Sequence, residues 1–194
     1  MPRQIFEYDP PDRFVAGTVG EPGSRTFFLQ ASGGGRTTSV ALEKQQVSVL
    51  AERVEALLDE VVRRTAGEAS VPAMPPAEVD DTAPLTAPIE EEFRVGTMAL
   101  AWDGDDEVVV IEAQAVTEND PEDGEDPDDD LPLIAEDDED GPPLLRVRLT
   151  GSAARAFAKR ASAVVSAGRP PCPFCGGPLD ASGHVCPRAN GYRR

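Results

Sequence analysis

Four side chains of the types that bind metals in proteins lie close together near the C-terminal end of the chain: Cys172, Cys175, His184 and Cys186. They include every cysteine and the only histidine among the 194 residues. Structural Zn²⁺ sites use four such ligands, commonly with a Cys-x-x-Cys pair in a tight turn. Because protein side chains would fill all four positions, we predict a structural zinc knuckle and no metal-activated water.

A redox pair is the main alternative for these cysteines. The string Cys172-Pro-Phe-Cys175 is also typical of a glutaredoxin-like active site, in which the first cysteine lies at a helix N-terminus that lowers its pKa. Residues 176–178, Gly-Gly-Pro, oppose a helix at this point and therefore favour the metal. The spacing His184-x-Cys186 is tighter than usual, which leaves open a fourth ligand from elsewhere.

The sequence gives little support to catalysis. If the sole histidine binds the metal, no Ser-His or Cys-His pair remains. Asp103, Asp105 and Asp106 favour a turn, and most other acids lie in runs that cannot hold the fixed geometry of acid–base catalysis. We therefore expect a protein that is not an enzyme, and an enzyme of unrecognised type stays an alternative.

The charge of the chain is concentrated in one run. The net charge is −18, and residues 118–140 hold fourteen acids and no Lys or Arg, so the rest carries −18 + 14 = −4. We interpret the run as a solvated, disordered loop, with docking on a basic partner surface as the functional alternative. Residues 155–194 carry seven basic side chains against Asp180. Arg188, Arg193 and Arg194 suggest a second alternative, a nucleic-acid- or ribosome-associated module.

The sequence predicts a cytoplasmic location. The first residues contain no apolar run of the kind found in a signal peptide, and no stretch approaches the roughly 20 apolar residues that cross a bilayer. Three cysteines cannot form a closed disulfide framework, which favours a reducing compartment. We expect a protein partner and no membrane contact, while the oligomeric state stays open.

Alternation and helical periodicity predict six strands and two helices. The expected strands are 13–19, 25–31, 36–42, 92–102, 106–117 and 144–149, and the expected helices are 43–64 and 151–167. Residues 66–92 are rich in proline and small residues, and we interpret them as a mobile linker.

The order of the elements predicts an α+β fold of two βββα units that share an antiparallel sheet, with both helices on one face. The units are 1–65 and 93–168, joined by the linker; the second carries the acidic insertion 118–141, and the zinc tail is 169–194. The apolar face of the first helix recurs in the second at an offset of 107 residues, and Phe14-Val-Ala-Gly-Thr resembles Phe93-Arg-Val-Gly-Thr. We therefore predict a duplication.

Three long strings resemble an actinobacterial signature family catalogued as a domain of unknown function. They are MPRQIFEYDPPDRFVAGTVGEPGSRTFFLQA, EKQQVSVLAERVEALLDEV and CPFCGGPLDASGHVCPRANGYR. The family includes ParJ, described as a partner of the chromosome-segregation ATPase ParA that restrains its polymerisation. The resemblance implies a non-enzymatic cytosolic regulator, possible contact with a ParA-like ATPase, and an actinobacterial source. It supplies no catalytic residues.

Overall fold

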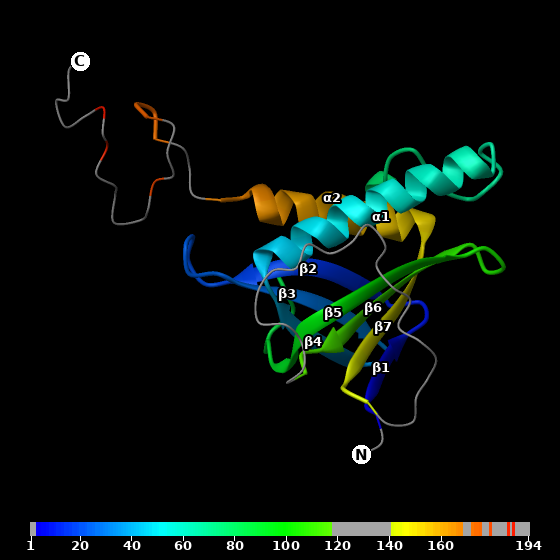
Figure 1. Ribbon diagram of the computed structural model, residues 1–194, viewed down its shortest axis with the longest axis horizontal. Coiled ribbons are helices and arrows are strands. Elements are labelled where there is room, and N and C mark those ends of the chain that lie inside the picture. The colour runs from blue at the N-terminus through cyan, green and yellow to red at the C-terminus, as the bar shows by residue number, and fades with distance from the viewer. Residues whose placement is uncertain are drawn as a thin grey trace.

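The computed structural model describes residues 3–117, 141–168, 172–175, 179, 186 and 188. In this part of the chain an α+β fold of seven strands, two α-helices and one short 3₁₀ helix is formed, as Figure 1 shows. The elements are β1 (Ile5–Tyr8), β2 (Arg13–Val19), β3 (Thr26–Gly33), β4 (Arg36–Leu42), α1 (Lys44–Arg64), η1 (Ala77–Val79), β5 (Glu91–Asp103), β6 (Val108–Ala115), β7 (Leu144–Thr150) and α2 (Gly151–Ser166). Each strand and helix that the sequence predicts is present within a few residues of its expected bounds.

The seven strands form one sheet in the order β1-β7-β6-β5-β4-β3-β2. Four of the six strand pairs are antiparallel, but β1 with β7 and β4 with β5 are parallel. The prediction of an antiparallel sheet is therefore wrong at these two joints. At one joint the reason is β1, whose four residues carry too little alternation to be recognised in the sequence. At the other joint the chain passes from β4 through α1 to β5, and a helical crossover of this kind permits parallel pairing.

The sheet must curl, because its two edge strands are consecutive in the chain. Only residues 9–12 separate β1 from β2. Five residue steps from Tyr8 to Arg13 span at most about 18 Å. In a flat sheet the six strand spacings between the edges would add up to roughly 29 Å. The strands in Figure 1 accordingly turn around a common interior, which the buried apolar side chains fill.

Both helices lie side by side over the same side of the curled sheet (Figure 1), as the sequence predicts. A capping box between Glu43 and Gln46 begins α1, and the Thr150 hydroxyl accepts a hydrogen bond from the Ala153 amide at the start of α2. The buried stripe of α1 recurs at helical spacing and includes Val47, Leu50, Val54, Leu58 and Val61.

Arg155 joins the two helices. Its side chain is buried on α2 and donates hydrogen bonds to the carboxylates of Glu55 and Asp59 on α1. Burial lowers the pKa of Arg155, but the hydrogen bonds to Asp59 and Glu55 outweigh it and raise the pKa overall. Arg155 thus links α2 to α1 through ion pairs with Glu55 and Asp59.

The two helices are related by the offset that the sequence suggests, whereas the duplication itself stays a prediction. They begin at Lys44 and Gly151, which are 107 residues apart, the offset at which their apolar faces match in the sequence. Four successive buried positions of α1 correspond to four buried positions of α2: Val47, Leu50, Ala51 and Val54 to Ala154, Phe157, Ala158 and Ala161.

The first strands do not match as the sequence suggests. When the sheet register is counted outward from Val40 and Val147, Phe14 becomes equivalent to Met98 and not to Phe93. The similarity between the two Phe-x-x-Gly-Thr strings therefore does not reflect equivalent positions in the sheet. The duplication itself stays a prediction.

We predict that Phe157→Ala destabilises the fold by about 3–5 kcal/mol, the usual cost of removing a fully packed aromatic ring. Phe157 is buried on α2 and stacks on Phe14 of β2, with 4.6 Å between the ring centroids. Urea denaturation followed by circular dichroism measures the effect. Phe174→Ala is the matched control, because that ring is 64% exposed and its loss leaves no cavity in the core. Equal midpoints for the two variants would contradict the prediction.

Candidate functional site

The three cysteine thiols form one cluster. The Sγ atoms of Cys172, Cys175 and Cys186 all lie within 4.8 Å of one another, and none is in a disulfide. Cys172 and Cys186 are buried and Cys175 is half-buried. Residues that are far apart along the tail are thus brought together with their sulfur atoms converging, an arrangement that can hold a metal ion.

The spacing of the thiols fits a tetrahedral metal. The Sγ atoms of Cys172 and Cys186 are 3.8 Å apart. Four ligands at the Zn–S bond length of about 2.3 Å occupy the corners of a tetrahedron whose edges measure about 3.8 Å. A disulfide would instead bring two sulfur atoms to about 2.05 Å. The distance between these two thiols is therefore compatible with a shared metal ion.

The local turn stabilises a thiolate at Cys172. The Phe174 amide donates a hydrogen bond to the Cys172 Sγ at 3.4 Å, and Arg188 Nη1 donates to the Phe174 carbonyl at 3.2 Å. Burial raises the pKa of Cys172, but hydrogen bonds from the Cys175 and Phe174 amides and from the neighbouring thiols lower it overall. Because metals bind the thiolate, the turn favours the form of the side chain that coordinates.

Several predicted features lie outside the described residues. His184, the expected fourth ligand, is among them, and so are Arg193, Arg194 and the acidic run 118–140. Of the terminal arginines the structure describes Arg188, whose guanidinium fixes the turn around Phe174. Three of the four predicted metal ligands are therefore brought together, and the fourth stays a prediction.

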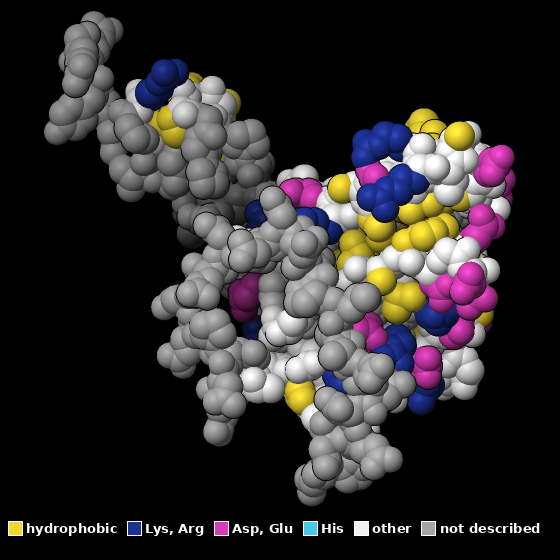
Figure 2. Space-filling view, turned by 45° about the vertical axis from the view of Figure 1, so that its right-hand side comes forward, with side chains coloured by type: hydrophobic (Ala, Val, Ile, Leu, Met, Phe, Trp, Pro, Cys, Tyr) yellow, Lys and Arg dark blue, Asp and Glu magenta, His cyan; other side chains and the backbone are white. Residues whose placement is uncertain are grey.

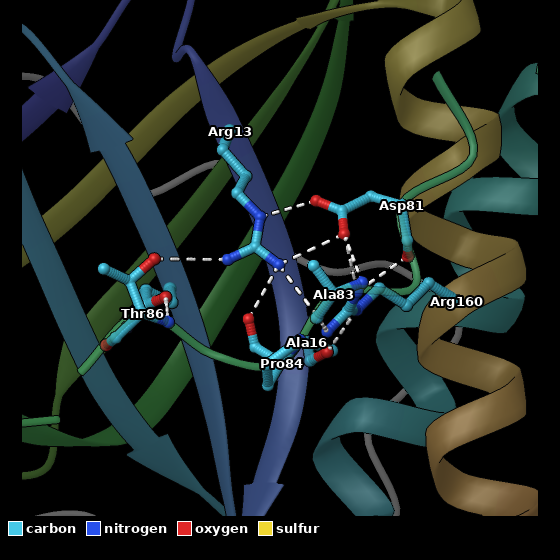
Figure 3. Close-up of polar contacts among 8 residues, drawn as sticks. Arg13, Ala16, Asp81, Ala83, Pro84, Thr86 and Arg160 are labelled. Atoms are coloured by element: carbon cyan, nitrogen blue, oxygen red, sulfur yellow. Dashed lines mark hydrogen bonds and ion pairs between the residues drawn. The ribbon is translucent and has the colours of Figure 1, made fainter. Parts of the chain in front are cut away.

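The Pro-rich segment does more than connect the two units. We call residues 78–90 the strap, because this part of the predicted linker lies against β2, β3 and α2 (Figure 3). Asp81 is its main anchor. The Arg13 guanidinium of β2 donates to both Asp81 oxygens, at 2.5 Å from Nε and 3.1 Å from Nη2. Such a two-point contact fixes both distance and orientation.

A second arginine holds the strap from the helix side. Arg160 of α2 donates to the Asp81 side chain at 3.1 Å and to the main-chain carbonyls of Asp81 and Ala83 at 2.6 and 2.7 Å. Its Nε also donates to the Ala16 carbonyl of β2 at 2.8 Å. Burial lowers the pKa of Arg160, and the Asp81 charge opposes that shift. Arg160 thus satisfies an edge-strand carbonyl and the strap together.

A cavity of about 600 Å³ lies beneath this anchor, between β2, the strap and α2. Its apolar wall includes Phe14, Leu149 and Phe157, and Arg13, Asp81 and Arg160 form a charged wall. These three charged groups are engaged with one another, as the dashed lines in Figure 3 show. They support the wall of the cavity.

A second arginine-centred cluster closes the β5–β6 hairpin. The Asp103 carboxylate accepts hydrogen bonds from the Asp105 and Asp106 amides, which confirms the predicted turn. Arg148 of β7 forms ion pairs with Asp103, Asp106 and Asp9. The hydrogen bond from Arg148 is the main cause that lowers the pKa of Asp103. The cluster ties the hairpin to the β1–β2 connection.

One face of the molecule carries a band of hydrophobic side chains, with acidic side chains beside it (Figure 2). Partly buried apolar residues that pack against the core include Leu57, Leu100 and Trp102. None of the helices that the structure describes combines the length and the hydrophobicity of a membrane-spanning helix.

The residues that hold the strap carry little signal in the sequence. Arg13, Gln30 and Arg160 belong to no recognisable motif of their strand or helix, and Asp81 is one acid among several. Gln30 carried the best signal, because an amide side chain within the apolar string Phe27–Ala31 of a strand needs a partner when it is buried.

A protein-family model matches most of the chain. The model of a family described as a protein of unknown function, DUF3090, matches residues 6–186. No curated protein and no solved structure matches the chain.

We predict that Asp81→Asn destabilises the fold by about 1 kcal/mol at pH 7 and progressively less in acid. The hydrogen bond from Arg13 is the main cause that lowers the pKa of Asp81 below its ordinary value of 3.8, while burial opposes it. A carboxyl with a lowered pKa stabilises the fold above that ordinary value, and the contribution disappears as the pH falls through the lowered pKa.

Urea denaturation between pH 7 and pH 2.5 measures the difference between the variant and the unaltered protein. Asp80→Asn is the neighbouring control, because Asp80 pairs with Lys159, whose side chain is 54% exposed, and surface pairs contribute little. A constant difference across the pH range, or equal effects of the two variants, would contradict the role given to Asp81.

Proposed function

We propose that this chain, which belongs to the DUF3090 family of proteins of unknown function, is a non-catalytic interaction protein with a structural zinc ion in its C-terminal turn. The observation that carries the proposal is the thiol cluster, whose 3.8 Å Sγ–Sγ distance suits a zinc tetrahedron. His184 is the fourth ligand in this proposal. A zinc ion with four protein ligands stabilises a small turn and leaves no position for a reacting water molecule.

The charged clusters of the fold support a non-catalytic role. Asp81 and Asp103 are carboxyls whose pKa is lowered by arginines. A general acid at neutral pH needs the opposite shift, because burial or a neighbouring negative charge must keep its proton in place. Both carboxylates also have their hydrogen-bonding capacity directed to the fold. They therefore suit a structural role.

The proposed partner is a ParA-like ATPase in chromosome segregation. This part of the proposal comes from the resemblance of the sequence and from its charge. An assembly that binds DNA needs basic surfaces, and the fourteen acids of residues 118–140 would compete for such a surface. In this mechanism the protein regulates the ATPase by binding and performs no reaction of its own.

We predict that protein purified in reducing, chelator-free buffer contains about one zinc ion per chain. Cys172→Ser and His184→Ala should each lower zinc affinity by at least about tenfold, because each removes one ligand from a saturated site. Elemental analysis and competition with a chromophoric chelator measure content and affinity. Co²⁺ substitution gives a second readout, since a tetrahedral thiolate site has a characteristic visible spectrum.

Ser182→Ala is the control in the same tail and should leave the affinity unchanged. Full affinity in His184→Ala would assign the fourth position to another ligand. Protein that contains no zinc after this purification would contradict the metal site.

We predict that replacing the acidic run 118–140 by a Gly/Ser segment of equal length weakens binding to a ParA-like ATPase. The remaining interaction should also depend less on salt, because ionic screening acts on the exposed charges that have been removed. Fluorescence anisotropy at low and high salt measures both effects. Equal affinities for the two proteins at both salt concentrations would exclude the acidic run as the contact.

A further inference from the structure

Gln30 contacts the strap as a receptor contacts a bound peptide. Its side chain is 2% exposed on β3. Its Nε2 donates to the Thr86 carbonyl at 3.0 Å, and its Oε1 accepts from the Thr86 amide at 2.8 Å. A further hydrogen bond to the Ser39 hydroxyl at 3.1 Å orients the amide. One side chain therefore binds both main-chain groups of a single residue, and hydrogen bonds to the main chain give affinity in peptide recognition.

Arg13 recognises the segment just before Thr86. Beyond its two bonds to Asp81, it donates to the carbonyls of Ala83 and Pro84 at 2.9 and 3.0 Å and to the Thr86 hydroxyl at 3.3 Å. Proline has no amide hydrogen and favours an extended backbone, so its neighbourhood presents carbonyls to such a donor. Figure 3 shows the Arg13 guanidinium at the centre of these contacts.

Gly17 of β2 leaves room for the side chain of Leu85, which lies between the residues that Arg13 and Gln30 contact. Gly17 faces Leu85, and a Cβ atom at position 17 would lie 2.6 Å from the Leu85 side chain. Real Cβ atoms do not approach so closely, so glycine at this position makes room for the leucine. The outer face of β2 and β3 thus contacts an acid at position 81, the main chain on both sides of Leu85, and a leucine four residues after the acid.

The strap leaves much of its other side to solvent. Thr82, Ala83, Pro84 and Thr86 are exposed, and no helix or strand forms between η1 and β5. The strap is therefore held mainly by side chains of β2, β3 and α2 that contact its backbone and its anchor residues. A peptide that binds a protein surface in an extended conformation makes contacts of the same kind.

We propose that the outer face of β2 and β3 is a peptide-recognition surface that the strap occupies in cis. The ligand in trans is an extended segment of a partner protein with the pattern Asp-Thr-Ala-Pro-Leu-Thr or a close equivalent, with the acid placed on Arg13 and the leucine at Gly17. The inference deepens the proposed role as an interaction protein by naming a contact surface. It depends neither on the zinc site nor on the ATPase.

Covalent attachment makes the strap an effective inhibitor of this surface. A short tether gives an effective concentration in the millimolar range, so a free peptide with the same contacts competes poorly. A partner displaces the strap only when its own segment binds more tightly or is held nearby by a second contact. The surface is therefore closed in the isolated protein and opens during binding.

The test uses a fluorescein-labelled peptide of residues 78–90, EVDDTAPLTAPIE, and three full-length proteins. The first is unaltered, the second carries D81N and L85A in its own strap, and the third carries these changes together with Q30A. We expect no binding to the first protein at micromolar concentration, saturable binding to the second, and at least tenfold weaker binding to the third. Fluorescence anisotropy measures the affinities, and circular dichroism with urea denaturation confirms that each variant is folded.

A control peptide with Asn and Ala at the two anchor positions should bind at least tenfold more weakly than the first peptide. A second measurement uses the unaltered protein, so that it does not depend on the stability of any variant. Millimolar peptide should accelerate hydrogen exchange at the Thr86 amide, because displacement of the strap breaks its bond to Gln30.

Several results would overturn the proposal: no saturable binding to the folded strap variant, equal binding of the two peptides, or Thr86 exchange that is unchanged at millimolar peptide. A dimer of the unaltered protein that dissociates on addition of the peptide would assign the surface to a second copy of the chain and overturn the assignment to a separate partner. The zinc and ATPase experiments use other readouts, so their failure is distinguishable from the failure of this surface.

Discussion

The connection from β1 to β2 determines the shape of the whole sheet. Residues 9–12 join strands that stand at opposite ends of the strand order, and a chain of this length cannot cross a flat sheet of seven strands. Curling brings the two edges together and creates an interior that the helices cover. Arg148 stabilises this closure, because it pairs with Asp9 in the connection and with Asp103 in the opposite hairpin.

Closure leaves an edge and an outer face that still need cover, and the strap supplies part of it. Arg160 satisfies a carbonyl at the edge of β2, while Gln30 is buried on the outer face against the strap. Both arginines of this region bind Asp81, so a single acid in a segment without regular structure connects β2 with α2. The segment that looks least structured by composition thus joins elements from both halves of the chain.

The sequence was sufficient for the elements that depend on local pattern. Helical periodicity over the 21 residues of α1 and alternation in β4 predict their bounds closely. Burial of one face requires apolar residues at regular intervals in the sequence. The cysteine cluster was also predictable, since thiols have few uses and their spacing along the chain is restrictive.

The parts that escaped prediction depend on distant partners. β1 is defined by its pairing with β7, which lies far along the chain, and four residues leave no readable pattern. The composition of the strap gives no sign of its contacts, which are made by Arg13, Gln30 and Arg160 on other elements. Polar side chains that contact a main chain follow no periodic pattern in the sequence. Gln30, within the otherwise apolar string Phe27–Ala31, is the one residue whose position indicates that a hydrogen-bond partner must lie nearby.

The two parallel joints, β4 with β5 and β1 with β7, also have a consequence for dissecting the molecule. Each joint pairs a strand from one half of the chain with a strand from the other half, so main-chain hydrogen bonds connect the halves at two places. Separating the chain between α1 and β5 would give two fragments. Each would expose unpaired strand edges and part of the hydrophobic core. Such fragments are expected to be insoluble when expressed separately and to recover the fold only when produced together.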